Sequence, residues 1–352
     1  MEQQCRKNIV SQKLKADRMG AQFRPHFKTH QSVEIGRWFR QEGITGITVS
    51  TPQMAEYFIN DEWDDITIGF PFYSGQIEDL KRLSTHVKFR LFVHTSEDVK
   101  LIAREIKDPI SILIETDAGY GRSGISAGNI SRIQSVIDEV QKSDHVSFHG
   151  FYIHDGDTYN VQGKDNVADV MDRNLRALDR LNSKYPEAAI CLGDTPSCSL
   201  LTDLNDVDEL SPGNLIFYDL MQINIGSCGF NDIGLLVEAP VAQQKPENDQ
   251  CIIHGGAVHF SKDRINYNSQ VTFGQPVTVS KQGSIEKIEG ASLVALSQEH
   301  GTISGLSALQ KASDTKTLES VWICPVHSCL TANLFSEYQT INGKIIEKRI
   351  LS

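Results

Sequence analysis

The chain has 352 residues, enough for one large barrel or for two domains. Hydrophobic residues make up 39% and charged residues 22%, which is ordinary for a soluble globular protein. The net charge of −11 argues against a nucleic-acid-binding protein, which usually presents a basic face. No apolar run is long enough to span a membrane, and the polar N-terminus lacks a secretory hydrophobic region. Seven scattered cysteines without a C-x-x-C pair indicate reduced thiols, so we expect a cytoplasmic protein.

Apolar, β-branched runs alternate with helix-like segments in the first part of the chain. The expected strands are 22–27, 46–50, 65–70, 88–93, 111–117, 147–154, 188–193 and a short one at 208–210. The expected helices are 32–42, 52–59, 77–83, 97–106, 129–142 and 167–185. Eight strands that alternate with helices predict a parallel (β/α)8 barrel of the TIM type. A doubly wound sheet is the alternative, which the strand count disfavours.

The pattern changes after about Gly226. Short strand-like runs there alternate with turn signals, such as Gly274-Gln275-Pro276 and Asn342-Gly343, and little looks helical. We therefore expect a barrel over residues 1–225 and a second, mostly β domain over residues 226–352.

The first expected strand ends in a lysine, within Arg24-Pro25-His26-Phe27-Lys28-Thr29-His30. A lysine at the carboxyl end of a barrel strand is well placed to form a Schiff base with a cofactor aldehyde. The alternative is a solvated lysine in a basic turn.

Other polar residues also follow the expected barrel strands, where active groups lie in such folds. The glycine-rich stretch 117–124 carries Arg122, a fixed cation, although an ordinary glycine turn with a surface arginine would look the same. The stretches 193–199 and 211–214 are rich in small, hydroxylated and glycine residues, which suit a phosphate held by backbone N–H groups and hydroxyls. A lone Pro-Gly-Asn is usually only a turn, but two such stretches after the last two strands favour the phosphate.

A histidine and a cysteine stand two residues apart in Pro325-Val326-His327-Ser328-Cys329. On a strand, their side chains would face the same side. Imidazole and thiolate together favour Zn²⁺, and two protein ligands leave positions open for substrate and water. The alternative is a core cysteine beside a histidine whose hydrogen bonds are satisfied.

Five motifs together resemble one enzyme family. They are R-P-H-F-K-T-H, G-D-T-P-S-C-S, S-P-G-N-L-I-F-Y-D-L, L-S-Q-E-H-G and P-V-H-S-C, in order from about Phe23 to Asn333. The set resembles the D-serine dehydratase family, which belongs with the D-threonine aldolases among pyridoxal-phosphate enzymes of the alanine-racemase-like fold, fold type III.

The resemblance implies roles for individual residues. Lys28 matches the lysine that binds pyridoxal 5'-phosphate covalently, and Arg122 resembles the arginine that contacts its phenolic oxygen. The remaining matched positions are cofactor- and phosphate-binding residues or residues that line the same site: Tyr152, His154, Tyr159, Thr195, Gly213 and Asn214. His327 and Cys329 match the zinc pair. D-Threonine aldolases usually carry a carboxylate at the position of Cys329, so this cysteine favours a dehydratase.

The activity implied by the resemblance is a pyridoxal-phosphate- and zinc-dependent elimination of water from D-serine or a related 3-hydroxy D-amino acid. The products would be a keto acid and ammonia. A metal-dependent retro-aldol cleavage of D-threonine-like substrates and a non-catalytic pyridoxal-phosphate-binding protein remain alternatives. A racemase is disfavoured, because no residue clearly supplies a second base on the opposite face. Related folds are head-to-tail dimers, so we expect a homodimer.

The chain also departs from the family pattern. The loop 152–157 carries acids where close dehydratases have cysteine and asparagine, and the stretch 253–259 replaces a different strand pattern. Both departures leave the identity of the substrate open. The family usually starts with a P-x-L-L-L-D strand, whereas Met1 here lies almost directly at the first helix. We expect either a truncated chain or another strand over that sheet edge.

Overall fold

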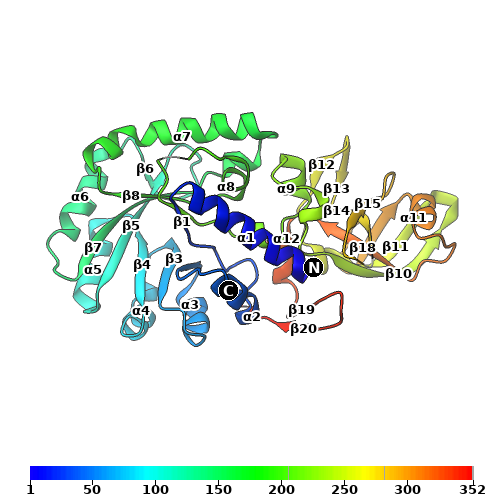
Figure 1. The fold of residues 1–352 in the computed structure, drawn as a ribbon, viewed down its shortest axis with the longest axis horizontal. Helices are drawn as coiled ribbons and strands as arrows, with labels where there is room; N and C mark the ends of the chain where they lie inside the picture. The colour runs from blue at the N-terminus through cyan, green and yellow to red at the C-terminus, as the bar shows by residue number, and fades with distance from the viewer. Residues whose placement is uncertain (205, 281, 351–352) are drawn as a thin grey trace. The chain divides into compact units, whose positions relative to one another are not determined.

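The computed structural model describes residues 1–204, 206–280 and 282–350. They form two compact units (Figure 1). The barrel unit contains residues 10–213 and the chain end from Arg349, and the β unit contains Met1–Ile9 and Asn214–Lys348. The units therefore meet in the sequence at Gly213/Asn214, before the expected boundary at 225/226. Helix α1 (Glu2–Arg18) begins in the β unit and continues in the barrel unit.

The barrel unit is built on parallel strands, as the sequence predicts. Its sheet runs in the order β1-β9-β8-β7-β5-β4-β3-β2, with β6 paired to β5 alone. The strands are β1 (Gln22–Phe23), β2 (Ile47–Val49), β3 (Asp65–Pro71), β4 (Lys88–Val93), β5 (Ile110–Asp117), β6 (Ile125–Ser126), β7 (Val146–Ile153), β8 (Ala189–Leu192) and β9 (Glu209–Leu210). Neighbours that are consecutive in sequence are joined through helices, which is the (β/α) arrangement.

The first segment closes the sheet into a barrel. The N–H groups of Arg24 and His26 donate to the carbonyls of Leu210 (2.8 Å) and Pro212 (3.1 Å) on one side. On the other side Phe27 N–H donates to the Thr48 carbonyl (2.8 Å), and His26 and Thr48 form a parallel bridge. The expected strand 22–27 is thus present as a paired segment, but β1 itself ends at Phe23, because Pro25 has no N–H to donate.

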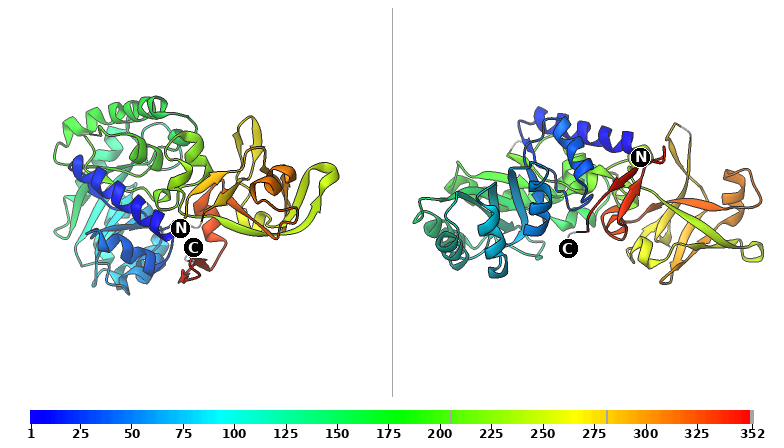
Figure 2. Two further views of the ribbon diagram at one scale, coloured as in Figure 1. Left: turned by 45° about the vertical axis from the view of Figure 1, so that its right-hand side comes forward. Right: turned by 90° about the horizontal axis from the view of Figure 1, so that it is seen from below.

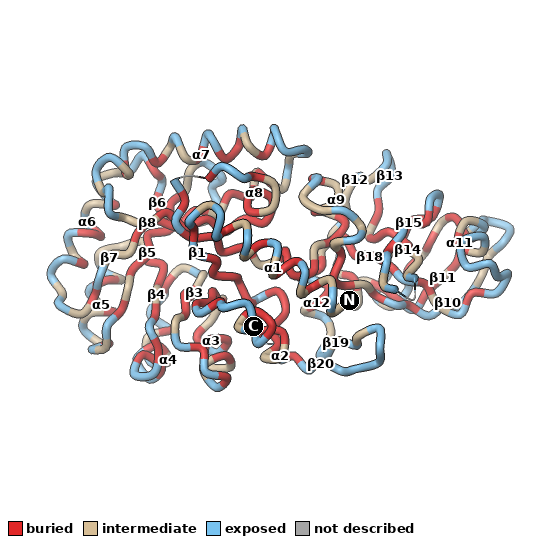
Figure 3. The backbone as a smooth tube through the Cα atoms, viewed as in Figure 1, coloured by how far each residue is buried: buried red, intermediate tan, exposed pale blue. Residues whose placement is uncertain are grey.

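The helices of the barrel unit lie outside the strands (Figure 2). They are α2 (Val33–Gln41), α3 (Pro52–Ile59), α4 (Ile77–Leu83), α5 (Ser96–Glu105), α6 (Ile130–Val140), α7 (Lys164–Lys184) and α8 (Thr195–Leu200), with 3-10 turns η1 (Ser74–Gln76) and η2 (Gly156–Tyr159). Thr51 and Thr95 cap α3 and α5 by accepting the N–H groups of Met54 and Asp98. Buried and exposed residues alternate along α7, as expected for a helix with one apolar face (Figure 3).

A buried ion network crosses the interior of the barrel. Arg24, which is 0% exposed, donates to Glu209 (2.7 Å) and to both carboxylate oxygens of Asp65 (2.9 and 2.7 Å). Arg90 donates to the same oxygen of Glu209 (2.6 Å). The charges are therefore paired, as buried charges must be. Gly46 leaves room for the network, because a Cβ there would lie 2.5 Å from the Arg24 guanidinium.

The β unit is mostly antiparallel sheet, as predicted. Its seven-stranded sheet runs β15-β14-β18-β10-β11-β17-β16, and β12-β13 and β19-β20 form two small hairpins. The strands are β10 (Val237–Lys245), β11 (Gln250–His254), β12 (Ile265–Tyr267), β13 (Gln270–Thr272), β14 (Gly274–Val279), β15 (Ile285–Lys287), β16 (Ser292–Leu296), β17 (His300–Ser304), β18 (Ser320–Pro325), β19 (Glu337–Gln339) and β20 (Ile345–Glu347).

Short helices cover this sheet. They are α9 (Leu220–Ile225), α10 (Ala257–Phe260), α11 (Leu306–Ala312) and α12 (Ser328–Asn333), with 3-10 turns η3 (Asn214–Ile216), η4 (Phe230–Asp232) and η5 (Pro246–Asn248). The main core of the unit gathers buried side chains from β10, β11, β17, β18 and α11, among them Ile253, Ile303 and Ile323. Across the described residues of both units, no helix is both long and apolar enough to cross a membrane.

Candidate functional site

Lys28 stands in a rigid turn after the first barrel segment. Phe27 precedes it and is fully buried, with ring contacts to His30 (4.4 Å between centroids), Phe58 (4.9 Å) and Trp63 (5.2 Å). Lys28 N–H donates to His26 Nδ1 (3.3 Å), and the Gln31 side chain donates to the Lys28 carbonyl (3.1 Å). An exposed lysine between buried neighbours is therefore held in place by its own backbone.

The Arg122 cation and two imidazoles, those of His26 and His154, lie near this lysine. Burial, together with the charges of Arg122 and Lys28, lowers the pKa of His154 to about 3. Burial and the charge of Lys28 likewise lower the pKa of His26. Both imidazoles are therefore neutral at physiological pH. Lys28 and Arg122 thus each lie within electrostatic reach of His154.

Glu115, at the end of β5, balances this charge and was not predicted. Its carboxylate accepts from Ser123 Oγ (2.7 Å) and Arg122 (3.4 Å) and lies 3.2 Å from His94 Nε2. Burial alone would raise the pKa of Glu115, but the bonds to His94 and Ser123 and the charge of Arg122 outweigh it and lower this pKa. Glu115 and His94 both lie at the ends of barrel strands, where functional groups of such folds stand. Their place after apolar strand patterns could therefore have identified them as candidates from the sequence.

Tyr152 lies near the end of β7, opposite Glu115 of β5, and is buried there. Its ring is 5% exposed and contacts Phe92 at 4.4 Å between centroids. Its hydroxyl occupies the space beside Gly193, where a Cβ would lie 1.7 Å away. Burial, and then the charge of Glu115, raise the pKa of Tyr152 well above its usual value. Tyr152 is therefore neutral, and its hydroxyl lies beside Gly193 in the turn after β8.

Thr195 begins α8 directly after that turn, and Tyr159, the last residue of η2, contacts it. Asp194 caps α8 by accepting Ser197 N–H (2.8 Å), and it also accepts Thr158 Oγ1 (3.0 Å). The Tyr159 hydroxyl accepts Thr195 N–H at 3.2 Å. Ser197 Oγ is buried and makes no hydrogen bond of normal geometry with a described residue, although it lies near enough to Asp194 to lower the pKa of that carboxyl against the effect of burial. A buried hydroxyl without a partner is costly and suggests a missing acceptor, such as a phosphate oxygen.

Gly213 closes the same end of the barrel. A Cβ on this residue would lie 2.9 Å from Thr29 Oγ1 and 3.0 Å from the His26 carbonyl, so only glycine lets the chain pass this close to the Lys28 turn. Pyridoxal phosphate needs a lysine for its aldehyde, polar groups for its ring and donors for its phosphate. The barrel unit offers Lys28, the Arg122 cation, and the hydroxyl and N–H groups of the turn after β8, so its residues fit this cofactor.

The predicted zinc pair belongs to the β unit. The strand suggested for these residues is wrong. His327 and Cys329 do not lie on a strand, because β18 ends at Pro325 and α12 begins at Ser328. The Ser328 N–H donates to Asp219 Oδ2 (2.9 Å) and is thus unavailable to a sheet partner. The two side chains nevertheless meet. Burial would lower the pKa of His327, but bonds to Asp263 and Cys329 raise it to about 10.

Asp263 orients the imidazole of His327. His327 Nδ1 lies 2.8 Å from Asp263 Oδ2, which leaves Nε2 as the other ring nitrogen. The bond to His327 lowers the pKa of Asp263, which is therefore ionised at neutral pH. A carboxylate on the second nitrogen of a ligating histidine is the usual support of a metal site. Sixty-four residues separate the two, and no sequence signal linked them.

Asn214 supports the cysteine. Its amide nitrogen donates to Cys329 Sγ (3.5 Å), Ser328 Oγ (3.1 Å) and Asp219 Oδ2 (2.6 Å). The structure thus places Asn214, predicted as a cofactor residue, beside the metal pair of the β unit. Imidazole, thiolate and a supporting carboxylate form a donor set that suits Zn²⁺, so the residues fit this ion as well.

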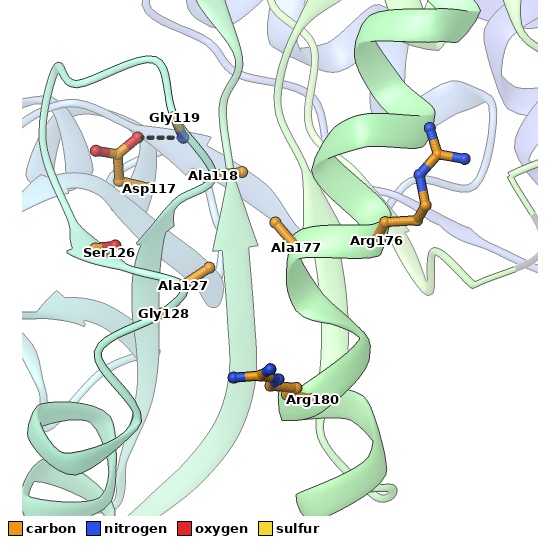
Figure 4. A pocket seen from close by; sticks show the side chains of 9 residues that line it. All are labelled: Asp117, Ala118, Gly119, Ser126, Ala127, Gly128, Arg176, Ala177 and Arg180. Carbon is orange, nitrogen blue, oxygen red and sulfur yellow. Dashed lines mark hydrogen bonds between the residues drawn. The ribbon is translucent and has the colours of Figure 1, made fainter.

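Two other features of the barrel unit are poor candidates. His149, Cys191 and Glu209 could together surround an ion, but Glu209 already accepts two arginines, whose charges would repel a cation. A surface cavity of about 360 Å³ lies between the loop after β5 and helix α7 (Figure 4). Its lining includes Asp117, Arg176 and Arg180, and none of the predicted site residues belongs to it.

Comparisons with known proteins match both units. Residues 2–220 match the family model described as alanine racemase, N-terminal domain. Residues 234–341 match the model described as putative serine dehydratase domain. D-Serine dehydratase of Dictyostelium discoideum is 28% identical over 368 residues, which cover 96% of this chain and 91% of that protein.

Two further relatives are similar over almost the whole chain. D-threo-3-hydroxyaspartate dehydratase of Delftia sp. (strain HT23) is 26% identical, covering 95% of this chain and 90% of that protein. Its solved structure has a TM-score of 0.87 at 24% identity, covering 99% and 95% of the two chains. A D-threo-3-hydroxyaspartate dehydratase variant with a cysteine replaced by alanine has been solved in a metal-free form (TM-score 0.84). D-Threonine aldolase of an Arthrobacter species is 22% identical, covering 97% of this chain and 87% of that protein.

Proposed function

Because the chain belongs to the family of the alanine racemase N-terminal domain, we propose that it is a pyridoxal-phosphate- and zinc-dependent dehydratase. The proposed substrate is D-serine or a related 3-hydroxy D-amino acid, and the products are a keto acid and ammonia. The family predicted from the sequence is confirmed, and so is the enzyme class, a lyase, since the named relatives are dehydratases. The observation that carries the proposal is the fixed Lys28 turn beside Arg122 and the neutral His154.

Pyridoxal phosphate, held by Lys28, would supply an electron sink for the charge left when the α-proton is removed. With that cofactor bound, the amine of Lys28 would also be the base that takes the α-proton of the substrate. The buried Phe27 and the hydrogen-bonded Lys28 backbone would hold the base of this side chain in one place. This preserves the geometry of proton transfer.

Arg122 would face the cofactor as a fixed cation. The ion pair with Glu115 restrains its guanidinium, and Glu115 is itself held by Ser123 and His94. His154 and His26 are uncharged at neutral pH. Arg122 and Lys28 are therefore the cations that make the local electrostatic potential positive. Tyr159, Thr195 and Gly213 would hold the phosphate end, with Ser197 Oγ as a further donor.

The hydroxyl of the substrate is a poor leaving group, and His327 and Cys329 would hold a zinc ion whose Lewis acidity assists its departure. Asp263 binds Nδ1 of His327, which leaves Nε2 available for the metal. The Asn214 amide donates to the sulfur of Cys329 and holds it in place. The metal-free form of the cysteine-to-alanine dehydratase variant supports a cysteine in this role.

The direct test is keto-acid release from D-serine by cofactor-loaded protein, with and without a zinc chelator. Chelator-sensitive pyruvate release is the expected result. Lys28→Ala should lose the visible absorbance of bound cofactor, and a variant that keeps this absorbance would refute the role of Lys28. Full activity of His327→Ala under metal-free conditions would refute the zinc role.

Retro-aldol cleavage is the second candidate, because the chain is also similar to a D-threonine aldolase. That reaction needs a base on the hydroxyl instead of removal of the α-proton. Product analysis separates the two, since the aldolase would release glycine and an aldehyde. A non-catalytic pyridoxal-phosphate-binding protein would not need the β unit or its His327/Cys329 pair.

The location and assembly of the protein are also part of the proposal. The cysteines in the described residues are all free, which fits a reducing cytoplasm. We expect a homodimer by analogy with the fold, and light scattering on the purified protein would measure it.

A further inference from the structure

The β unit contains a second group of metal-ligating side chains outside the His327/Cys329 pair. Ligand atoms of His254, His259 and Glu299 all lie within 4.8 Å of one another. His254 Nε2 is 3.6 Å from Glu299 Oε2, and the two imidazole centroids are 5.4 Å apart. The two histidines fall in the stretch 253–259 that departs from the family pattern, and the proposed elimination does not use the cluster.

The backbone holds these three residues together. His254 ends β11, and His259 lies in the short helix α10 that follows. The turn that carries Glu299 is bound to this segment by three backbone hydrogen bonds: Gly255 N–H to the Glu299 carbonyl (3.0 Å), Ala257 N–H to the Ser297 carbonyl (2.8 Å) and Val258 N–H to the Gln298 carbonyl (3.2 Å). The proximity of the three side chains therefore follows from paired backbone.

Gly256 makes this close approach possible. A Cβ on Gly256 would lie 2.2 Å from the Gln298 carbonyl oxygen, a backbone atom that has no freedom to move aside. Any other residue would push the turn at Glu299 away from the histidines. The Gly255-Gly256 pair thus determines the geometry of the cluster.

The donor set suits a transition metal. Two imidazoles and one carboxylate are the protein ligands of a zinc site that keeps a position open. The side chains of His254 and Glu299 are 62% and 46% exposed, so the open positions would face solvent. In the barrel cluster the carboxylate of Glu209 is occupied by arginines, but here no described arginine or lysine forms an ion pair with Glu299.

We propose that His254, His259 and Glu299 form a second metal site, which takes one divalent transition ion of the zinc class and completes its coordination with water. His259 Nδ1 accepts Gly256 N–H (3.2 Å), and a metal on either ring nitrogen replaces this bond. The ion also replaces the direct approach of His254 to Glu299. The loss of the Gly256–His259 bond and the solvent exposure of His254 and Glu299 make this site weaker than a closed structural zinc site. The bound ion links β11 and α10 to the turn before β17.

The test counts metal ions in the full-length protein. Metal-free protein is equilibrated with excess Co²⁺, freed of unbound metal by gel filtration and analysed by atomic spectroscopy. The variant His254→Gln/His259→Gln should bind about one ion fewer per chain than the wild type. His86→Gln, which changes an exposed histidine of the barrel unit, is the matched control and should bind as the wild type does.

A second variant guards against misfolding. Glu299→Gln keeps the shape of the side chain and should weaken Co²⁺ binding without changing the circular dichroism spectrum. Equal metal content in the wild type and in both variants would overturn the proposal.

The spectrum of bound Co²⁺ separates this site from the one at Cys329. Thiolate ligation gives an intense charge-transfer band, which a site of two histidines and a glutamate lacks. The double variant should keep that band and lose the second ion. If the wild type binds one ion without the band and the double variant binds none, the second site stands and the His327/Cys329 pair fails as a zinc site.

Discussion

Replacing Asp263 with alanine isolates the role of a carboxylate in holding the proposed zinc ligand. The Asp263–His327 bond is 2.8 Å long and involves a charged acceptor, and such bonds contribute about 1.5–3 kcal/mol. Asp263 is 41% exposed, so solvent screening places the effect at the lower end. A loss of about 1.5 kcal/mol corresponds to roughly tenfold weaker zinc binding, within the range for partners of metal-bound histidines.

The assay is zinc competition between the metal-free protein and a chelator of known affinity. Asp263→Glu should recover part of the loss, because it restores the carboxylate. Glu286→Gln is the control, since it removes one exposed charge of the same unit from a residue that does not contact Asp263 or His327. The metal-free Asp263→Ala protein should also unfold at a lower temperature, because the same bond is lost there, so zinc affinities are compared where both proteins are folded. Wild-type zinc affinity in Asp263→Ala would refute the argument that this carboxylate orients His327.

Three predictions concern the barrel unit. Burial raises the pKa of Asp194 from its usual value of 3.8 to about 6, so between these two values the folded state holds the proton more tightly than the unfolded chain does. The free energy of unfolding should fall by up to about 3 kcal/mol as the pH rises through that interval. Asp194→Asn keeps the helix cap but cannot titrate, so its free energy of unfolding in urea should not show this pH-dependent loss. Arg24→Met should cost about 3–5 kcal/mol in the free energy of unfolding, because it leaves Glu209 and Asp65 less well paired, and an unchanged denaturation midpoint would contradict this. Gly193→Ala should cost about 1–3 kcal/mol in the same assay, because its Cβ overlaps the buried Tyr152 hydroxyl; wild-type stability would show that the ring moves aside.

The barrel could be predicted because its evidence is local. Each strand is a short apolar run and each following helix has its own apolar periodicity, so pattern and spacing were sufficient. The same local patterns predicted that Lys28 and Arg122 follow barrel strands. The mouth of a parallel barrel collects those ends, so residues far apart in the sequence share one site.

The β unit shows where such reasoning fails. The H-x-C spacing suggested a strand, but Asp219, over one hundred residues earlier, takes the Ser328 N–H and lets α12 begin. A contact of that kind depends on the packed chain and leaves no periodic signal in the sequence.

The sequence by itself therefore determined the barrel, the mostly β second domain and the place of Lys28 after the first barrel segment, because these depend on local patterns. Only the tertiary structure decided the supporting partners: Glu115 for Arg122, Asp263 for His327, and Glu299 beside His254 and His259. The physical reason is that a carboxylate can support a cation or an imidazole from any place in the sequence, provided that the fold brings the two within hydrogen-bond or metal-ligand distance.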